Sequence, residues 1–498
     1  MNVKKNTIAN YLGQSYSLAI SVITLPLFFN LLGAEAYGLV GLYAVLYAWF
    51  AIFDLGMTPA LGREVARLRA SNATDDKILL VISTFERISL AIVFILGVTF
   101  ILLSDRLAVH WLKVENLDLN QVIFSLQFLA LAIALRLQTT VYKSVINGSE
   151  EQVWLNGFDI IIATLRYPLL LGIIALDPAR FEWFFIGQAI LSALEIVGLR
   201  LKIAKLFTGQ STTKNFDFNV IRPLLSFVAL SAYTAALGIA ITQYDKLILS
   251  TSLSLNDYGY FSLLAVVTAG IVALTGPISK AILPRLTAFY QQQNINGMIG
   301  LYKKATFAMV ATLSPLVAVI ALWPYEVIFA WSGNTHAAEW IQPVMPWFVG
   351  STGLVCIILF QYFLQYAHGD LRYNARFSTA LFLVSVPLIT WSAFQYGVMG
   401  VAVVLFILRL LIFLFWVPYV HSKFVPGMHA SWLRESVIAP FLITLGTYLI
   451  LMAIDAFLPA ADSRIMTSLR LVVFLSAGYI ALLIWIKTKR PDLLASGN

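Results

Sequence analysis

The sequence has 498 residues, of which 60% are hydrophobic and 12% are charged. Soluble proteins contain roughly 45–50% apolar and about 25% charged residues, so this composition excludes an ordinary soluble enzyme. With a mean hydropathy of +0.83, the chain is predicted to be an integral membrane protein. We attribute the formal charge of +8 to lysines and arginines held on one side of a bilayer, and we expect no nucleic-acid partner.

Apolar runs of about 20 residues, the length that crosses a hydrocarbon layer, predict an all-α membrane protein with about 14 transmembrane helices. The first run has no cleavage site at the usual distance, so we expect a retained helix. The predicted spans are residues 9–31, 37–62, 78–103, 119–145, 153–176, 181–206, 220–250, 256–280, 303–329, 341–366, 372–395, 398–421, 436–458 and 466–487.

The distribution of positive charge predicts the orientation of the chain. An even number of spans puts both termini on one side of the membrane. If that side is the cytoplasm, the segments facing it carry about five times as many lysines and arginines as the outer segments. We therefore expect both termini to be cytoplasmic.

Two parts of the sequence resemble each other at an offset of 221 residues. Residues 32–68 match residues 253–289, and Tyr37-Gly38 aligns with Tyr258-Gly259. This predicts two parallel six-helix bundles related by a pseudo-two-fold axis along the membrane normal. We place the bundles at residues 1–210 and 211–425, followed by two additional helices and a cytoplasmic tail in residues 426–498.

Polar residues recur along one face of the first predicted helix. Asn10 and Gln14 belong to this stripe, and Thr242 and Asp245 follow the same rhythm in the seventh helix. The pattern predicts that both helices line a shared cavity. The alternative is that these small polar residues only allow helices to pack closely.

We select nine ionisable residues inside predicted spans, where each central charge costs about 2.5–3.5 kcal/mol. The summed cost of burying these charges exceeds a typical net stability of about 5–15 kcal/mol, so the charges must face water or one another. Guanidinium binds phosphate through planar bidentate hydrogen bonds. The candidates for binding an anionic substrate are Arg87, Arg136, Arg166, Arg409 and Lys246, together with Asn10 and Gln14; the carboxylates are Asp54, Glu86, Asp159 and Asp245.

Structural ion pairing is the alternative for these charges, for example Arg87 with Asp54 or Arg136 with Glu86. Other chemistry has little support in the sequence. The single cysteine, Cys356, permits no intrachain disulfide, the five histidines lack the spacing of a zinc site, and no GxxxxGK[ST] motif occurs. We therefore predict no catalytic residues, no metal and no cofactor.

The opening 70 residues contain Leu32-Gly33, Tyr37-Gly38, Asp54-Leu55-Gly56 and Arg63-Glu64. With these features the segment resembles the Wzx-type polysaccharide (O-antigen) flippases of the multidrug/oligosaccharidyl-lipid/polysaccharide superfamily. The resemblance implies two bundles around a cationic lumen that opens alternately to each side of the bacterial inner membrane. It implies an oligosaccharide on polyprenyl pyrophosphate as cargo, moved to the periplasmic leaflet, with membrane lipids and a polysaccharide polymerase or ligase as partners.

The resemblance also leaves alternatives open. The superfamily suggests proton or sodium coupling at Asp54, Glu86, Asp159 or Asp245, because protonation of a buried carboxylate can bias one conformation; these carboxylates could equally serve only to neutralise arginines. A multidrug exporter of the same superfamily would favour a lumen rich in carboxylates and aromatic rings. A membrane glycosyltransferase, polymerase or ligase would need a sizeable outer loop, and the predicted loops are short.

Overall fold

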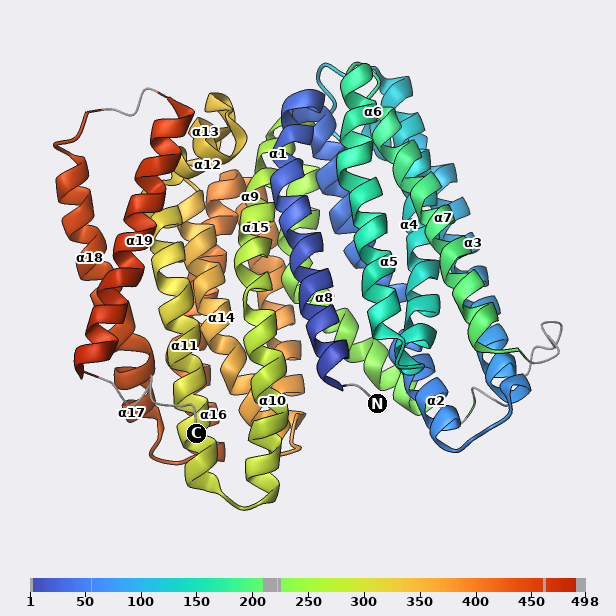
Figure 1. The fold of residues 1–498 in the computed structure, drawn as a ribbon. Helices are drawn as coiled ribbons and strands as arrows, with labels where there is room; N and C mark the ends of the chain where they lie inside the picture. The colour runs from blue at the N-terminus through green and yellow to red at the C-terminus, as the bar shows by residue number, and fades with distance from the viewer. Residues whose placement is uncertain (1–2, 55, 209–221, 223–224, 460–462, 490–498) are drawn as a thin grey trace. The chain divides into compact units, whose positions relative to one another are not determined.

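A computed structural model describes all residues except 1–2, 55, 209–221, 223–224, 460–462 and 490–498. Within the described residues the chain is helical and contains no β-strand, which confirms the predicted all-α class (Figure 1). It divides into two compact units, residues 1–262 and 263–498. The predicted domain boundaries at residues 210 and 425 stay predictions.

The first unit contains eight complete helices among its described residues and the start of a ninth. They are α1 (Val3–Phe50), α2 (Met57–Ala70), α3 (Asp75–His110), α4 (Leu119–Gly148), α5 (Gln152–Thr164), α6 (Leu170–Leu176), α7 (Glu182–Leu206) and α8 (Leu225–Ser252), then α9 (Leu255–Ala273), which continues into the second unit. A short 3-10 helix (Ala51–Asp54) follows α1, and a π-helix (Leu165–Leu169) joins α5 to α6.

The described part of the second unit continues with α10 (Thr275–Gln291), α11 (Ile295–Leu322), α12 (Pro324–Ser332), α13 (Thr335–Ile341), α14 (Met345–Ala367) and α15 (Arg372–Leu411). The last elements are α16 (Val417–Phe424), α17 (His429–Trp432), α18 (Ala439–Asp455) and α19 (Arg464–Lys489), and π-helices precede α16 (Ile412–Trp416) and α18 (Leu433–Ile438).

Eleven segments of the described chain are long and apolar enough to cross a membrane. Two of the long helices contain a non-helical glycine: Gly33 in α1 (φ 79°, ψ 165°) and Gly397 in α15 (φ 58°, ψ −143°). Glycine adopts these backbone angles readily because it has no Cβ. Both breaks fall where two predicted spans meet, but the number fourteen stays a prediction.

Helix α2 is outside the candidate spans, although its first residues were predicted to belong to the second span. It is amphipathic: Met57, Leu61 and Val65 are buried at helical spacing, whereas Arg63 and Arg67 are exposed. Arg67 donates two hydrogen bonds to the Glu64 carboxylate at 2.5 and 2.9 Å, and these bonds lower the pKa of that carboxyl.

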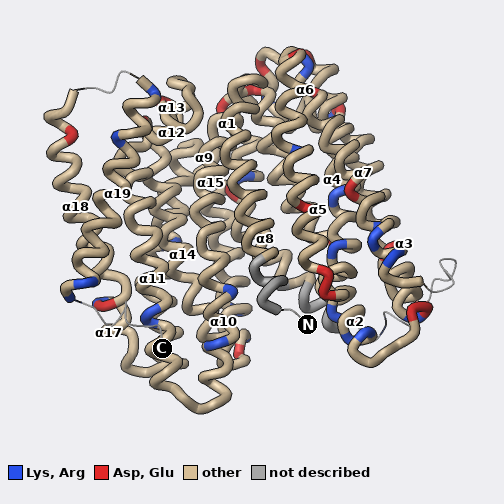
Figure 2. The backbone as a smooth tube through the Cα atoms, in the orientation of Figure 1, with Lys and Arg blue, Asp and Glu red and all other residues tan. Residues whose placement is uncertain are grey.

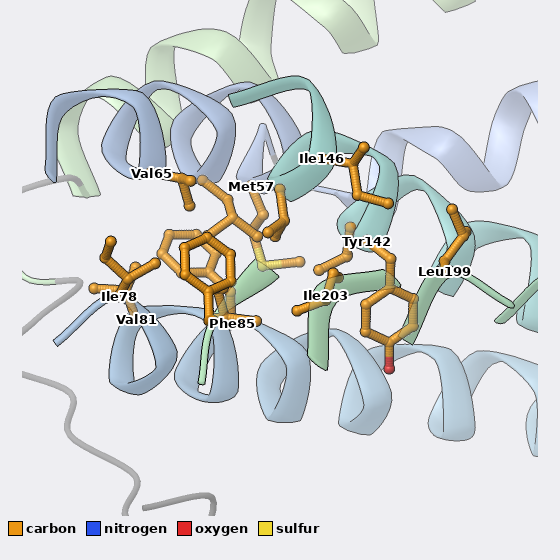
Figure 3. Close-up of a cluster of buried hydrophobic side chains, with 14 of the residues drawn as sticks. Met57, Val65, Ile78, Val81, Phe85, Tyr142, Ile146, Leu199 and Ile203 are labelled. Atoms are coloured by element: carbon orange, nitrogen blue, oxygen red, sulfur yellow. The ribbon is translucent and has the colours of Figure 1, made fainter. Parts of the chain in front are cut away.

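A buried apolar cluster fixes α2 against three longer helices. Figure 3 shows Met57 and Val65 of α2 facing Phe85 of α3, with Tyr142 of α4 and Leu199 of α7 beside them. Burying such a side chain contributes about 1.5–3 kcal/mol where it would otherwise meet water. The cluster thereby holds the ends of α3, α4 and α7 in register around α2.

The two matching sequence segments meet in the first unit. A Cβ added at Gly38 would overlap the carbonyl oxygen of Leu255, and one added at Gly259 would overlap the carbonyl oxygen of Ala34. Residues 34 and 255, like residues 38 and 259, are 221 positions apart. The offset found in the sequence therefore recurs as a reciprocal contact between the second half of α1 and the start of α9.

The same crossing continues at Gly41, which is also 221 residues from its neighbour. A Cβ at Gly41 would overlap the hydroxyl oxygen of Ser262. The two helices can pack this closely because three glycines present bare backbone at the contact. Glu35 stabilises the adjoining loop, since its buried carboxylate accepts hydrogen bonds from the backbone N–H groups of Glu115 and Asn116.

A buried polar cluster connects three helices of the second unit, α11, α16 and α17. The Tyr302 hydroxyl and His421 Nε2 are 2.8 Å apart, and His421 Nδ1 is 2.9 Å from His429 Nδ1. Trp432 Nε1 donates to the Thr306 hydroxyl at 3.0 Å. Because buried polar groups are costly when unpaired, this arrangement favours one packing of α11 against α16 and α17.

Candidate functional site

Glu195 of α7 lies at the centre of a charge network inside the first unit. Its side chain is 1% exposed and contacts Lys143 Nζ of α4 at 2.7 Å and Arg166 of the π-helix at 2.9 Å. Lys143 Nζ also contacts the Asp159 carboxylate of α5 at 2.8 Å. These four residues, here called the Glu195 network, balance two positive charges with two negative ones.

The local sequence explains how Arg166 reaches α7. Pro168 follows it and has no N–H to donate within the helix, and its ring would clash with a carbonyl of the preceding turn. A π-helix at Leu165–Leu169 accommodates the proline. Arg166 is buried and donates to Glu195 and, at 3.4 Å, to Ser192. Its Nε–H has no hydrogen-bond partner among the described residues.

A cavity of about 480 Å³, lined in part by polar side chains, lies between α2 and α4, next to the network. Lys143 is in its wall, together with Thr58, Thr140 and Asn147. Thr58 donates to the Asp54 carboxylate at 2.6 Å through its hydroxyl and at 3.1 Å through its backbone N–H. Ligand pockets commonly measure about 300–1,000 Å³, so the cavity is large enough for a polar group.

Two glycines allow α2 and α4 to cross at the end of this cavity. A Cβ at Gly148 would meet the Gly62 carbonyl oxygen at 2.5 Å, which is closer than real Cβ contacts. Both glycines also line the cavity. The cavity wall is therefore backbone on this side, with polar side chains around it.

Arg136 is on the same face of α4 as Thr140 and Lys143, because the three are spaced at four and three residues. Its guanidinium donates to the Tyr43 hydroxyl at 3.2 Å and lies 4.4 Å from the centroid of the Tyr47 ring. Both groups are neutral, in contrast to the carboxylate that binds Arg166. Arg166 is thus paired with a carboxylate, whereas Arg136 contacts the neutral Tyr43 and Tyr47 side chains.

Glu86 contacts residues other than Arg136, the partner that the sequence analysis suggests for it. It accepts a hydrogen bond from the Tyr142 hydroxyl at 2.6 Å and pairs with Arg200 at 3.1 Å. The adjacent Arg87 is half-buried on α3. Arg200 and Glu86 thus form a charged pair separate from the Glu195 network, next to the apolar cluster that contains Tyr142.

The predicted polar residues of α1 have different surroundings. Asn10 donates to the Gln152 side chain of α5 at 2.8 Å and accepts from Asn156, so it connects two helices. Gln14 is exposed. Ser231 and Thr234 precede Thr242 and Asp245 in the polar pattern of the α8 sequence, and nothing is described of their side chains.

The remaining predicted residues are not part of the Glu195 network. Lys246 Nζ contacts the buried Asp245 carboxylate at 3.3 Å on α8 and donates to the Thr242 carbonyl at 2.8 Å. Arg409 is half-buried near the end of α15 in the second unit. None of these positions has been tested for substrate binding or ion coupling, and their roles stay predictions.

The sequence analysis omitted the residues that join the network. Glu195 lies well inside the predicted span 181–206, so the criterion used for the other buried charges identifies it too. Lys143 is close to the end of the predicted span 119–145, but α4 continues to Gly148 and places it inside the helix. Among the described residues, no group of three or more histidines, cysteines and acidic residues could hold a metal ion.

The sequence was compared with known protein families and relatives. Residues 3–290 match the family described as "Polysaccharide biosynthesis protein". A Shigella flexneri protein named "Putative O-antigen transporter" is 20% identical over 425 residues, covering 81% of this chain and 94% of that protein. A Salmonella typhi protein of the same name is 27% identical over 258 residues, covering 50% and 56%.

Solved structures support the fold. The chain is similar to the lipid II flippase MurJ in an inward closed conformation, with a TM-score of 0.73, 13% identity, and coverage of 98% of this chain and 99% of that one. An inward-facing multidrug resistance MATE family transporter of the MOP superfamily has a TM-score of 0.66 and 14% identity, with coverage of 84% and 96%. The chain therefore has the fold that these membrane transporters share.

Proposed function

Because this chain belongs to the polysaccharide biosynthesis protein family, we propose that it is a flippase for a polyprenyl-pyrophosphate-linked oligosaccharide, the repeat unit of an O-antigen or a related surface polysaccharide. It transfers this lipid from the cytoplasmic to the periplasmic leaflet of a bacterial inner membrane by alternating access. The relatives named as O-antigen transporters support this substrate class. We expect transport without covalent chemistry, alongside a polysaccharide polymerase or ligase that uses the product.

The observation that carries the proposal is the polar face of α4 inside a membrane-spanning unit. It begins at Arg136, whose hydrogen-bond and ring contacts are with neutral tyrosines, and continues through Thr140 and Lys143 into the cavity beside α2. A pyrophosphate headgroup needs cations and hydrogen-bond donors at a depth where lipid tails offer none. This face supplies both.

The membrane potential favours export of such a lipid. A pyrophosphate carries about two negative charges, and each gains about 2.3 kcal/mol per 100 mV when it moves away from a negative cytoplasm without compensation. Coupling to protons or sodium is therefore not required energetically. If coupling occurs, Asp54, Glu86, Asp159 and Asp245 are the candidates we propose, because each is a carboxylate within or at the end of a membrane helix.

Deletion of the gene tests the proposed substrate class. We expect glycan-loaded polyprenyl pyrophosphate to accumulate in the membrane, detected by mass spectrometry of extracted lipids, and surface polysaccharide to fall. Expression of the wild-type chain should reverse both changes. A multidrug exporter, which the fold likeness to the MATE transporter keeps as a second candidate, would instead leave the lipids unchanged and lower drug resistance.

A further inference from the structure

An apolar groove of about 710 Å³ runs along one side of the second unit. One wall comes from the first half of α15, including Phe377, Ala380 and Val384. The opposite wall runs from Leu408 at the end of α15 to Tyr419 of α16, and includes the π-helix Ile412–Trp416. We call it the α15 groove.

Aromatic rings form the floor at one end of the groove. The Phe377 and Trp416 rings are stacked, with centroids 4.0 Å apart and planes inclined by 8°. Trp416 is also stacked on Tyr419 at 5.4 Å. Phe415 and Val384 remain 69% and 52% exposed, so the groove is open along its length. Flat rings beside open aliphatic walls provide a surface for a flexible, methyl-branched hydrocarbon chain.

Two exposed cations flank the aromatic end. Arg376 is one helical turn before Ala380 on the same face of α15, and Lys423 is one turn after Tyr419 on α16. Ring contacts of Tyr373 with Tyr419, at 6.3 Å, hold these two turns beside each other. In the proposed orientation this end is at the cytoplasmic surface.

The dimensions of the groove match one leaflet. From Phe377 to Val384 the helix rises about 10 Å, and from Leu408 to Tyr419 about 16 Å, at 1.5 Å per residue. One half of a hydrocarbon core is about 15 Å thick. A chain lying in the groove from the cationic end would therefore reach the middle of the membrane.

We propose that the α15 groove binds the polyprenyl chain of the substrate in the cytoplasmic leaflet, with its pyrophosphate between Arg376 and Lys423. This inference rests on the proposed function and adds a binding site for the lipid moiety. Two cations match the two negative charges of pyrophosphate, whereas an ordinary anionic phospholipid carries one.

Photocrosslinking tests the site directly. The purified chain in phosphatidylcholine nanodiscs is exposed to polyprenyl pyrophosphate bearing a diazirine on its chain, and crosslinked peptides are mapped by mass spectrometry. We expect crosslinks within residues 377–384 and 408–419, reduced by excess unlabelled polyprenyl pyrophosphate but not by phosphatidylglycerol. Crosslinks elsewhere, or equal competition by phosphatidylglycerol, would show only general lipid contact and overturn the proposal.

Matched variants separate the groove from the membrane surface around it. Val384→Trp fills the groove and should reduce crosslinking there about tenfold, whereas Leu383→Trp, at a 64% exposed neighbour, should leave it unchanged. Changing both Arg376 and Lys423 to Gln should weaken binding about 10–30-fold, since each surface cation contributes about 1 kcal/mol toward an anionic lipid headgroup. Equal effects of the two Trp variants would argue against the site.

The outcome can be distinguished from failure of the proposed function. If gene deletion accumulates the lipid-linked glycan but crosslinks map elsewhere, the flippase assignment stands and the groove proposal is wrong. If deletion leaves lipids unchanged, the flippase assignment fails whatever the crosslinks show.

Discussion

At the scale of single residues, Glu195 is the side chain on which its surroundings depend most. It is 1% exposed and contacts two cations from different helices. Removing one partner of a buried ion pair costs about 3–5 kcal/mol because the remaining charge is left without compensation. Neutralising Glu195 would remove a carboxylate partner from both Lys143 and Arg166.

We expect Glu195→Gln to lower the thermal unfolding midpoint of the protein in detergent, measured by intrinsic tryptophan fluorescence. Asp177→Asn is the control, because Asp177 and Arg180 form a pair with both side chains more than half exposed and should contribute less than about 1 kcal/mol. Combining Glu195→Leu with Lys143→Met and Arg166→Met should recover part of the loss. An unchanged midpoint for Glu195→Gln would show that the network does not stabilise the fold.

The sequence predicted which residue types carry this chemistry better than it predicted their partners. Arg166 and Asp159 were selected correctly as charges within spans, because a long apolar run is visible without a structure. That they meet through Lys143 and Glu195 depends on the rotation of three helices and on the π-helix at Pro168. Helical periodicity alone predicts neither the rotation of these helices nor the presence of the π-helix.

At the scale of helices, the glycine crossing of α1 and α9 allows these elements to pack closely. Two similar segments were evident in the sequence, but the sequence did not indicate that Gly38 and Gly259 would each face the other segment's backbone. Repeats resemble each other whether or not they touch. The contact depends on tertiary packing that similarity does not encode.

We expect Gly259→Ala to destabilise the protein and to reduce transport in complementation of the deletion strain. Its new methyl group would overlap the Ala34 carbonyl oxygen, and overpacking costs typically about 1–3 kcal/mol. Gly157→Ala on α5 is the matched control, since its Cβ would have no neighbour within 4 Å. Equal stability of the two variants would contradict a tight crossing.

At the scale of the whole molecule, composition and apolar periodicity were sufficient to predict an all-helical membrane protein. Local breaks in the helices were harder to predict. The predicted span 37–62 continues past the 3-10 helix Ala51–Asp54, where the candidate span of the structure ends, and α2 lies outside the candidate spans. Figure 2 shows lysines and arginines around α2 and the adjoining parts of neighbouring helices of that unit, and others near α10, α11 and α17 of the second unit. The cytoplasmic orientation of both termini stays a prediction from the positive-inside rule.

Accessibility labelling of single cysteines tests that orientation. In a background carrying Cys356→Ala, we expect Asp177→Cys to react with a membrane-impermeant maleimide in intact spheroplasts. Ser71→Cys, at the end of α2, should react only after the membrane is permeabilised. Labelling of both positions from outside, or the reverse pattern, would contradict cytoplasmic termini.

The close contact of Gly41 with Ser262 restricts how the two halves of this chain could diverge. If the halves descend from one duplicated segment, they began with the same residue at these equivalent positions. Serine in both would collide, because the Cβ of one would occupy the space of the other's hydroxyl. A side chain at either position therefore requires glycine at the other, and the present pair of Gly41 and Ser262 satisfies this steric exclusion.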